Sequence, residues 1–404
     1  MATLSIRDLD LHGKRVFIRV DFNVPLSIDG GEILDDTRIR ETLPTIEFAL
    51  RAKARVILAA HLGRPKGERV ESMSLRPVVD RLRMLLDADL GASRNVAFSP
   101  DCVGNIAHEL VDHLEYGQAL LLENLRFHSG EEKNDPEFAK ELASLADVYV
   151  NDAFGAAHRA HASTEGITHF VPQSAAGLLM EKELNYLGKA LDQPDRPFVA
   201  IIGGAKVSDK IGVIENLLNK VDAILIGGGM AYTFLNAKGQ KTGKSLLEAD
   251  KVELAASTLK RAEDKGVRLL LPVDHVLADR FASDAHAEVF DSTGDFPADK
   301  MALDIGPKTV ELFTEEVRGA RLIVWNGPMG VFEMPAFSRG TVAIAQAVAA
   351  NEDATTIVGG GDSVSAVHAA GVADRISHIS TGGGASLEFL EGQTLPGVTA
   401  LTQR

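Results

Sequence analysis

Glycine runs and cationic side chains give the two halves of this chain different means of binding phosphate. In the second half, the predicted strands end in the segments AIIGGAKVSDK, AILIGGGMAYTF, TTIVGGGDSVSAV and HISTGGGASLEFL. In the first half they end in RVDFNVP, HLGRP, ENLRFH and NDAFGAAHRAH. Backbone N–H groups at a helix N-terminus bind polyphosphate, whereas arginine binds phosphate or carboxylate through paired hydrogen bonds. The sequence therefore predicts two half-sites for two anionic ligands.

Charged residues accompany the glycine runs of the second half. Lys206 and Lys210 follow the predicted strand FVAII, with Lys210 expected in the first turn of a helix whose N-cap is Ser208. A cation there opposes the helix dipole unless an anion lies between them, which favours a phosphate site over a simple tight turn. In WNGPMGVFE, Glu333 is expected to bind the ribose hydroxyls of a nucleotide, the alternative being a solvated surface charge.

The segment TTIVGGGDS places Gly359, Gly360 and Gly361 directly before Asp362 and Ser363. Three glycines exceed what a turn requires and leave the backbone open to a ligand. A carboxylate beside a phosphate site predicts Mg²⁺, which proteins bind through one or two carboxylates together with phosphate oxygens. The alternative role for this aspartate is an ordinary helix N-cap.

The first half offers a cluster of polar and cationic side chains. Asp21 and Asn23 occupy alternate positions of a predicted strand end and are expected to face one side. One arginine is most often a surface ion pair, but four strand ends that each deliver a cation favour binding of phosphate or carboxylate. No carboxylate-and-histidine spacing typical of zinc accompanies them. These cations are His61, Arg64, Arg126, Arg159 and His161.

Composition limits the class of protein. The chain has 404 residues and a formal net charge of −15, and it contains no lysine or arginine run, which argues against a nucleic-acid partner. A single cysteine, Cys102, excludes an internal disulfide, suits a reducing compartment and is expected to be structural. No apolar stretch reaches the ~20 residues that a membrane span needs. We therefore expect a soluble cytoplasmic protein without a membrane partner.

Short apolar runs must position these motifs. RVFIRV, RVILAA, FVAIIGG, AILIGGG and RLIVWNG are continuous rather than alternating, which is typical of strands buried on both faces of a parallel sheet. Helical periodicity lies between them, at 75–86 and 211–221 for example. Strand–helix alternation predicts an α/β fold with open doubly wound sheets, whose ligands bind beyond the carboxyl ends of the strands. AKGQKTGKS lacks the first glycine of a P-loop and is predicted to be a surface turn.

One segment divides the chain. EKELNYLGKALDQPDRP is helical and charged and is then broken by Pro194 and Pro197, so it would link a unit ending near residue 180 to one starting near residue 198. If each unit holds one substrate, the two crevices must close to bring the reacting atoms within ~3.5 Å, and this segment is the natural hinge.

Taken together, these motifs resemble the phosphoglycerate kinase family over essentially the whole chain. The resemblance implies two Rossmann-like domains of similar size, each a doubly wound parallel sheet, joined by a linker helix. Its domains would be residues 1–180 for 3-phosphoglycerate, 181–197 as linker and hinge, and 198–389 for the nucleotide. The C-terminal tail, about 390–404, would pack back on the first domain.

The resemblance also implies an activity and a set of site residues. The reaction would be reversible, Mg²⁺-dependent phosphoryl transfer between 1,3-bisphosphoglycerate and ADP, giving 3-phosphoglycerate and ATP, carried out by a monomer. Carried over onto this chain, the glycerate site comprises Asp21, Asn23, Arg38, His61, Arg64, Arg126 and Arg159. The nucleotide site comprises Lys206, Lys210, Asn326, Glu333, Gly359, Gly360, Gly361, Asp362 and Ser363. Many members of the family have threonine where this chain has Ser363.

Catalysis in this interpretation is electrostatic. The acceptor is a carboxylate that is ionised well below neutral pH and needs no general base. We assign Arg38 and Lys206 to the transferring phosphoryl oxygens, with backbone N–H groups from Gly361 and Gly384, and Asp362 to the metal. Two rivals remain: a nucleotide-dependent oxidoreductase, which lacks its G-x-G-x-x-G motif here, and a non-catalytic nucleotide-binding protein.

Overall fold

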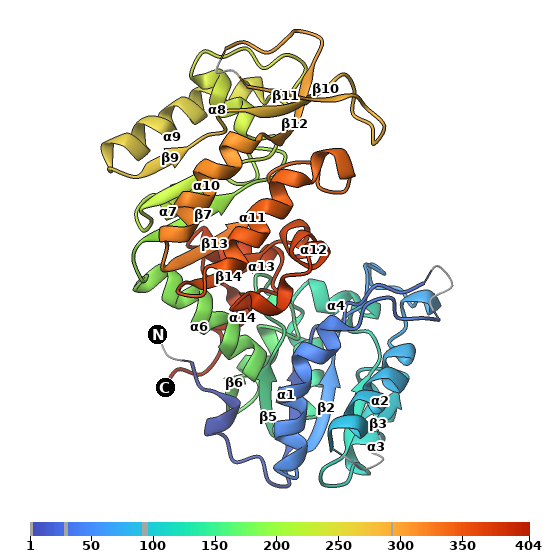
Figure 1. Ribbon diagram of the computed structural model, residues 1–404. Helices are drawn as coiled ribbons and strands as arrows, with labels where there is room; N and C mark the ends of the chain where they lie inside the picture. The colour runs from blue at the N-terminus through green and yellow to red at the C-terminus, as the bar shows by residue number, and fades with distance from the viewer. Residues whose placement is uncertain (1–2, 28–30, 91–95, 292–293) are drawn as a thin grey trace. The chain divides into compact units, whose positions relative to one another are not determined.

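The computed structural model in Figure 1 describes residues 3–27, 31–90, 96–291 and 294–404. The chain forms two compact units, unit 1 with Met1–Asn185 and Thr394–Arg404, and unit 2 with Tyr186–Gln393. The division falls within α6 (Leu178–Asp192), which lies largely inside the segment predicted as the linker. None of the described helices is both long enough and apolar enough to cross a membrane.

Unit 1 is built on a sheet of six parallel strands in the order β3-β4-β2-β1-β5-β6. Because β1 pairs with both β2 and β5, the strand order reverses between β1 and β5, and this is where an open α/β sheet binds its ligand. The strands are β1 (Arg15–Arg19), β2 (Arg55–Ala59), β3 (Val96–Ser99), β4 (Ala119–Leu122), β5 (Val148–Asn151) and β6 (Ser174–Ala176).

Alternate residues of the central strands build the core of unit 1. Val16 and Ile18 of β1 pack with Val56 and Leu58 of β2 in one apolar cluster. The predicted pattern at 75–86 supplies its helical side, since Val78, Val79, Leu82, Leu85 and Leu86 are all buried there. The helices of unit 1 are α1 (Thr37–Arg51), α2 (Arg76–Leu90), α3 (Gly104–Asp112), α4 (Ser129–Glu132), α5 (Pro136–Ser144) and the start of α6.

The C-terminal segment is tied to unit 1 by backbone hydrogen bonds. Leu4 N donates to Thr402 O at 2.7 Å, and Thr402 N donates to Ser174 O at 3.0 Å. Within α14 (Pro396–Thr399), Gly397 N donates to Ala157 O at 2.8 Å. The last eleven residues therefore belong to the unit that the chain left some two hundred residues earlier.

Asp152 fixes the start of the helix that leaves unit 1. Its Oδ1 accepts hydrogen bonds from Leu179 N at 2.9 Å and Met180 N at 3.1 Å, in the first turn of α6. Burial raises the pKa of this carboxyl to about 6, although the helix N–H groups oppose that shift. The motif NDAFGAAHRAH thus positions a helix as well as offering cations to a site.

The main sheet of unit 2 repeats the architecture with six parallel strands in the order β15-β14-β13-β7-β8-β9. Its order reverses between β7 and β13. The prediction of two doubly wound parallel sheets is therefore confirmed. These strands are β7 (Phe198–Ile202), β8 (Ala223–Ile226), β9 (Arg268–Leu270), β13 (Leu322–Asn326), β14 (Thr355–Gly359) and β15 (His378–Ile379).

Helices on the unit 2 sheet bury a second core. Val199, Ile201 and Trp325 of the strands pack with Phe313 of α10 and Ile344 of α11. The intervening strand residues are buried as well, as the continuous apolar runs predicted. The helices are α7 (Ile211–Leu217), α8 (Ala231–Ala237), α9 (Val252–Asp264), α10 (Pro307–Gly319), α11 (Arg339–Ala350), α12 (Gly361–Ala369) and α13 (Gly384–Leu390).

Unit 2 also contains a small antiparallel sheet that the sequence interpretation did not anticipate. It has the order β11-β10-β12, formed by β10 (His275–Ala278), β11 (Ala287–Phe290) and β12 (Met301–Ile305). These strands are short, and β11 is partly exposed, so they lack the continuous apolar run that identified the other strands. Figure 1 shows this sheet beside α8 at the end of unit 2.

Candidate active site

In unit 1, Arg38 and Asp21 form a partly buried ion pair beyond the end of β1. Nη1 of Arg38 donates to Oδ2 of Asp21 at 2.6 Å, and α1 supplies the arginine from its first turn. Burial alone would raise the pKa of Asp21, but the guanidinium groups of Arg38 and Arg19 outweigh it and hold the pKa below its usual range. The arginine side chain remains 37% exposed, so it is held by one partner and open to another.

Asn23 and Arg126 hold the loop that follows β2. Oδ1 of Asn23 accepts from Gly63 N at 2.9 Å, and Nη1 of Arg126 donates to Gly63 O at 2.8 Å. Both side chains thus fix the backbone between His61 and Arg64. Nε of Arg126 is buried without a hydrogen-bond partner. Burial lowers the pKa of this arginine, and the nearby charges of Arg19 and Arg159 lower it further.

The other predicted cations divide into exposed and buried groups. Arg64 and Arg159 are exposed, and Arg64 forms no hydrogen bond or ion pair with any residue that the structure describes. His61 and His161 are buried. Burial lowers the pKa of His161 to about 4, with Arg126 adding to that effect, and burial likewise lowers the pKa of His61 well below its ordinary value. Both histidines are therefore neutral at pH 7.

One local prediction in this half is wrong. Asp21 and Asn23 do not lie on a strand, because β1 ends at Arg19. Asn23 N donates to Oδ1 of Asp21 at 3.2 Å, a side-chain bond to the backbone that replaces sheet pairing. The aspartate therefore bends the chain after the strand, and each side chain takes its own partner.

In unit 2, glycines let three loops approach at the reversal point of the sheet. A Cβ on Gly203 would lie 2.1 Å from Pro328 O, and one on Gly228 would lie 2.5 Å from Gly204 O. Gly203 N donates to Asn326 O at 2.9 Å and Gly228 N to Met329 O at 2.9 Å. The glycine runs after β7, β8 and β13 thus bring bare backbone together at one edge of the sheet.

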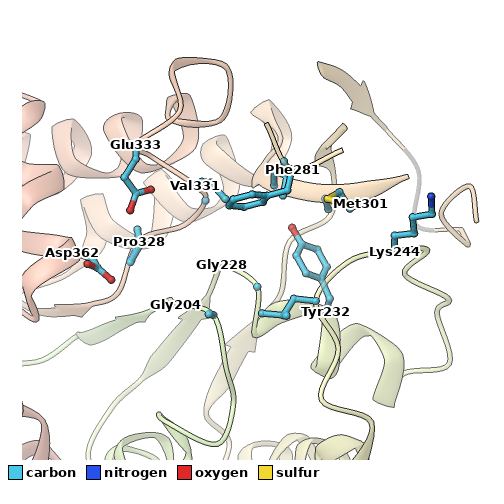
Figure 2. A pocket seen from close by; sticks show the side chains of 16 residues that line it. Gly204, Gly228, Tyr232, Lys244, Phe281, Met301, Pro328, Val331, Glu333 and Asp362 are labelled. Atoms are coloured by element: carbon cyan, nitrogen blue, oxygen red, sulfur yellow. The ribbon is translucent and has the colours of Figure 1, made fainter. Parts of the chain in front are cut away.

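A cavity of about 400 Å³ opens beside these loops (Figure 2). Backbone of Gly204, Gly228 and Gly229 forms one wall. Apolar side chains cover much of the rest, namely Leu246, Phe281, Met301, Leu303, Pro328 and Val331. Figure 2 shows Glu333 and Asp362 at one end of the cavity and Lys244 at the other. An apolar slot with charged groups at its ends suits a flat aromatic base that carries a polar, anionic chain.

The turn before α12 has two kinds of glycine. Gly360 has φ +87°, a conformation that other residues rarely adopt, and its position lies against Asn326. Gly361 begins the helix, and a Cβ there would meet nothing within 4 Å. Packing therefore does not require glycine at 361, and its N–H lies in the first turn of α12 beside the Asp362 carboxylate.

Ser363 has a different partner from the one that a ligand-binding role implies. It is fully buried, and its Oγ accepts a hydrogen bond from Gly327 N at 2.5 Å. It therefore connects α12 to the loop after β13. Gly384 begins α13, preceded by Gly383 with φ +51°.

Lys206 is exposed, whereas Lys210 is half-buried with Nζ donating to Oδ1 of Asn326. Burial lowers the pKa of Lys210, and the charges of Asp209 and Asp362 oppose that shift. The predicted cap is wrong, since Lys210 itself is the N-cap residue of α7 and Ser208 Oγ donates to Oε1 of Glu248 at 2.6 Å. Nothing in the sequence signalled a glutamate forty residues away as the serine's partner.

The segment AKGQKTGKS is more than the surface turn that we predicted. Lys244 lines the cavity and its N–H donates to Lys300 O at 2.7 Å. Ser245 is buried and its Oγ accepts from Ala302 N at 3.0 Å, at the start of β12. Tyr232, from α8, also lines the cavity and went unnoticed. Its position within the predicted helix AYTFLNA gave no chemical signal.

Cys102 has the environment expected of a structural cysteine. It is buried, and burial together with the negative charges of Asp101 and Glu131 raises the pKa of its thiol well above its ordinary value. Ligand atoms of Asp101, Cys102 and His128 lie within 4.8 Å of one another. Oδ1 of Asp101 already accepts from Cys102 N at 2.7 Å and contacts Nε2 of His128 at 2.6 Å, which accounts for the cluster without a metal.

Comparison with known proteins now adds to this geometry. The family model described as phosphoglycerate kinase matches residues 6–393. The phosphoglycerate kinases of Acidobacterium capsulatum and Koribacter versatilis are 73% and 67% identical to this chain, each over the full length of both. The chain belongs to the phosphoglycerate kinase family.

Solved phosphoglycerate kinase structures share the fold as well. That from Coxiella burnetii is 44% identical, with a TM-score of 0.89 over 100% of this chain and 99% of its own. That from Pyrococcus horikoshii is 34% identical, with a TM-score of 0.83 over 98% of both chains. The family resemblance inferred from the motifs is therefore confirmed.

Family membership settles the class of activity. The chain is a kinase, a phosphotransferase of glycolysis with phosphoglycerate kinase function. The oxidoreductase rival fails, and the non-catalytic alternative is not favoured. A nucleotide and a phosphoglycerate are the substrates that the family implies.

Proposed function

We propose that unit 1 binds 3-phosphoglycerate or 1,3-bisphosphoglycerate and that unit 2 binds ATP or ADP. The observation that carries this assignment is the contrast between the two sites. The cavity of unit 2 has apolar walls of a size suited to a nucleobase, with glycine backbone beside them. The cluster of unit 1 has guanidinium groups and hydrogen-bonding side chains, which suit a small anion with a phosphate and a carboxylate.

In unit 1, the side chains divide between binding and support. Arg64 and Arg159 are exposed cations open to phosphate, and Arg126 is a buried one. Asp21 orients Arg38, while Asn23 holds the Gly63 backbone. We assign these side chains, together with His61, to the glycerate ligand.

In unit 2, Glu333 is the group for ribose hydroxyls and the first turn of α12 is the group for phosphate. Lys206, Lys210 and the turn Gly359–Gly361 surround the same end of the cavity in this assignment. Asn326 orients Lys210, and Ser363 supports the turn from beneath. Gly384 is assigned a backbone N–H for the transferring group.

Mg²⁺ fits the residues present. Asp362 is exposed, lines the cavity and stands beside a helix N-terminus that favours phosphate. One carboxylate together with phosphate oxygens is the usual protein environment of this ion. When bound, the ion would neutralise phosphate charge, and Asp362 would hold it.

The chemical step needs charge neutralisation rather than a base. A carboxylate oxygen of 3-phosphoglycerate forms a bond to the terminal phosphorus of ATP as the bond from that phosphorus to the ADP oxygen breaks. The attacking carboxylate is already ionised, and both buried histidines of unit 1 are neutral. We propose that Arg38 and Lys206 stabilise the transferring phosphoryl oxygens, as donors of this kind do elsewhere.

A coupled assay with MgATP and 3-phosphoglycerate tests the activity. Binding of each substrate alone, measured by calorimetry on Arg126→Ala and Glu333→Ala variants, tests the assignment of the two sites. The first change should weaken only 3-phosphoglycerate and the second only ADP. The converse pattern would reverse the assignment. A cytoplasmic location and a monomeric state stay predictions from composition and from the family.

A further inference from the structure

Arg19 is a fully buried cation that the sequence interpretation did not assign to any site. It is the last residue of β1 and lies opposite Ala59 in the parallel register with β2. Val16 and Ile18 face the main core of unit 1, so Arg19 lies on the other face of the strand. A buried arginine requires partners for its charge and its five N–H groups, and those partners show what it does.

Each nitrogen of Arg19 donates to a different acceptor. Nε donates to Ser163 Oγ at 2.8 Å, and Nη1 donates to the carbonyl oxygen of Val20. Nη2 lies 3.0 Å from Nδ1 of His61. The first contact belongs to a longer chain, since Ser163 Oγ donates to Oε1 of Glu131 at 2.6 Å. Glu131 is itself fully buried and balances the charge of the arginine.

The contact between Arg19 and His61 has only one consistent protonation pattern. A guanidinium group has donors and no acceptor, and it keeps its proton in proteins. Nδ1 of His61 must therefore be the acceptor and carry no hydrogen. A neutral imidazole has one N–H, which must then be on Nε2.

The surroundings of His61 oppose any second proton on the ring. The charged groups around it are Asp21, Arg19, Arg126 and Arg38. Burial is the strongest influence and lowers the pKa of His61, the arginines lower it further, and Asp21 alone raises it. Nε2 has no hydrogen-bond partner among the described residues, and it is absent from the sealed, unsatisfied atoms.

We propose that Arg19 is a positioning residue that fixes His61 as the Nε2–H tautomer, so that His61 presents a hydrogen-bond donor and no basic lone pair to the phosphoglycerate. The proposal rests on the assignment of His61 to the glycerate site. Arg19 contributes through His61 and by holding one strand end against the next, without contacting the substrate. The buried chain from Glu131 through Ser163 to Arg19 exists, in this view, to orient one imidazole ring.

Nitrogen-15 NMR of the whole, ligand-free protein reads the tautomer directly. With histidine labelled, the long-range correlations of His61, identified by their loss in His61→Gln, should show Nδ1 unprotonated and Nε2 protonated. The pattern should stay the same from pH 8 to pH 6. A protonated Nδ1, or an imidazolium that titrates near 6.5, would overturn the proposal.

Two substitutions of the histidine test the donor role. The amide nitrogen of Gln reaches the position of Nε2, whereas that of Asn reaches only the position of Nδ1. His61→Gln should therefore keep the KM for 3-phosphoglycerate within a few-fold, whereas His61→Asn should raise it by roughly tenfold, the equivalent of one lost hydrogen bond. If Asn is tolerated better than Gln, or if both keep the original KM, His61 is not a donor to this ligand.

Changes at Arg19 test the positioning role. Arg19→Met combined with Glu131→Gln removes both buried charges, so that neither is left without its partner. The pair should give mixed His61 tautomers and a KM for 3-phosphoglycerate raised roughly tenfold, with MgADP affinity unchanged. Arg19→Gln with Glu131→Gln restores one donor and should recover the Nε2–H tautomer. A single Nε2–H tautomer in the Met variant would overturn the role, and if that variant fails to fold, the NMR of the unaltered protein still decides.

Discussion

The candidate site of unit 1 is made of side chains, whereas that of unit 2 is made largely of backbone. Arg38, Arg64 and Arg126 are cations held by side-chain and carbonyl partners or left open, behind which Arg19 lies fully buried. In unit 2 the corresponding strand ends carry glycines, whose N–H groups and apolar neighbours line a cavity.

This difference predicts different sensitivities to mutation. A side-chain donor is lost when the side chain is truncated, whereas a backbone N–H survives every substitution and is lost only when a Cβ blocks the way. Side-chain sites also need supporting residues that hold long, flexible cations in place, and backbone sites need glycines that let loops approach.

The largest expected effect comes from Arg38→Ala. It should lower kcat by roughly 10²–10³-fold, because it removes a donor assigned to the transferring phosphoryl group. MgADP affinity should hardly change, since the nucleotide is assigned to the other unit. Steady-state kinetics and calorimetry measure the two quantities.

Arg40→Ala is the matched control, because Arg40 lies on the same helix and pairs with Asp36 at the surface. It should leave both quantities unchanged. Equal losses of turnover and ADP affinity in Arg38→Ala would contradict the division between the units. A thermal melt of both variants separates loss of the Asp21 pair from loss of chemistry.

Gly361→Ala tests the backbone site. The methyl group meets no protein atom within 4 Å, so it should occupy space that the phosphate needs. MgADP binding should weaken by about tenfold, equivalent to ~1.4 kcal/mol, while thermal stability stays equal or rises. Gly319→Ala, at an exposed helical position that is equally open, should change neither affinity nor activity. Undiminished binding in Gly361→Ala would remove this turn from the phosphate site.

Asp362→Asn should raise the Mg²⁺ concentration needed for half-maximal activity by on the order of tenfold. The variant deletes the carboxylate beside the phosphate site and keeps its size. Asp374→Asn removes an exposed charge elsewhere in the same unit and serves as the control. An unchanged Mg²⁺ titration would exclude Asp362 as a ligand of the ion.

The smallest expected effect is that of pH on the chemical step. The pKa of His161 is about 4 and that of His61 is lowered, so each ring loses its proton below the ~6.5 reference value. Neither group titrates from pH 7 to pH 8.5. Single-turnover transfer from saturating MgATP to 3-phosphoglycerate should be nearly flat over that range. A steep rise through it would show a base that the electrostatic mechanism lacks.

Local signals in the sequence predicted the fold and the composition of both sites. Continuous apolar runs identified the parallel strands, and the motif residues lie at strand ends as the fold class requires. Long-range partners were out of reach. Ser208 looked like a helix cap, but its hydroxyl bonds to Glu248, and Ser363 looked like a ligand group, but it holds Gly327.

Arg19 illustrates the same limit within the best-recognised motif. It occupies the last position of a strand whose other residues are apolar, and its partners, His61 and Ser163, come from distant parts of the chain. A charged residue at a strand end gives no sign, in the sequence, of whether it faces solvent or lies fully buried. Lys244 shows the converse, since a segment dismissed as a turn lines the cavity.

The division of the two ligands between the two units is most directly tested by amide NMR of the whole protein, deuterated and titrated with one ligand at a time. With 3-phosphoglycerate alone, the amides that shift most should be those of residues 19–24, 61–64 and 126. With MgADP alone, they should be those near residues 203–206, 228–229 and 360–362. Shifts from 3-phosphoglycerate centred on the glycine loops of unit 2, or from MgADP centred on the arginine cluster of unit 1, would contradict the assignment.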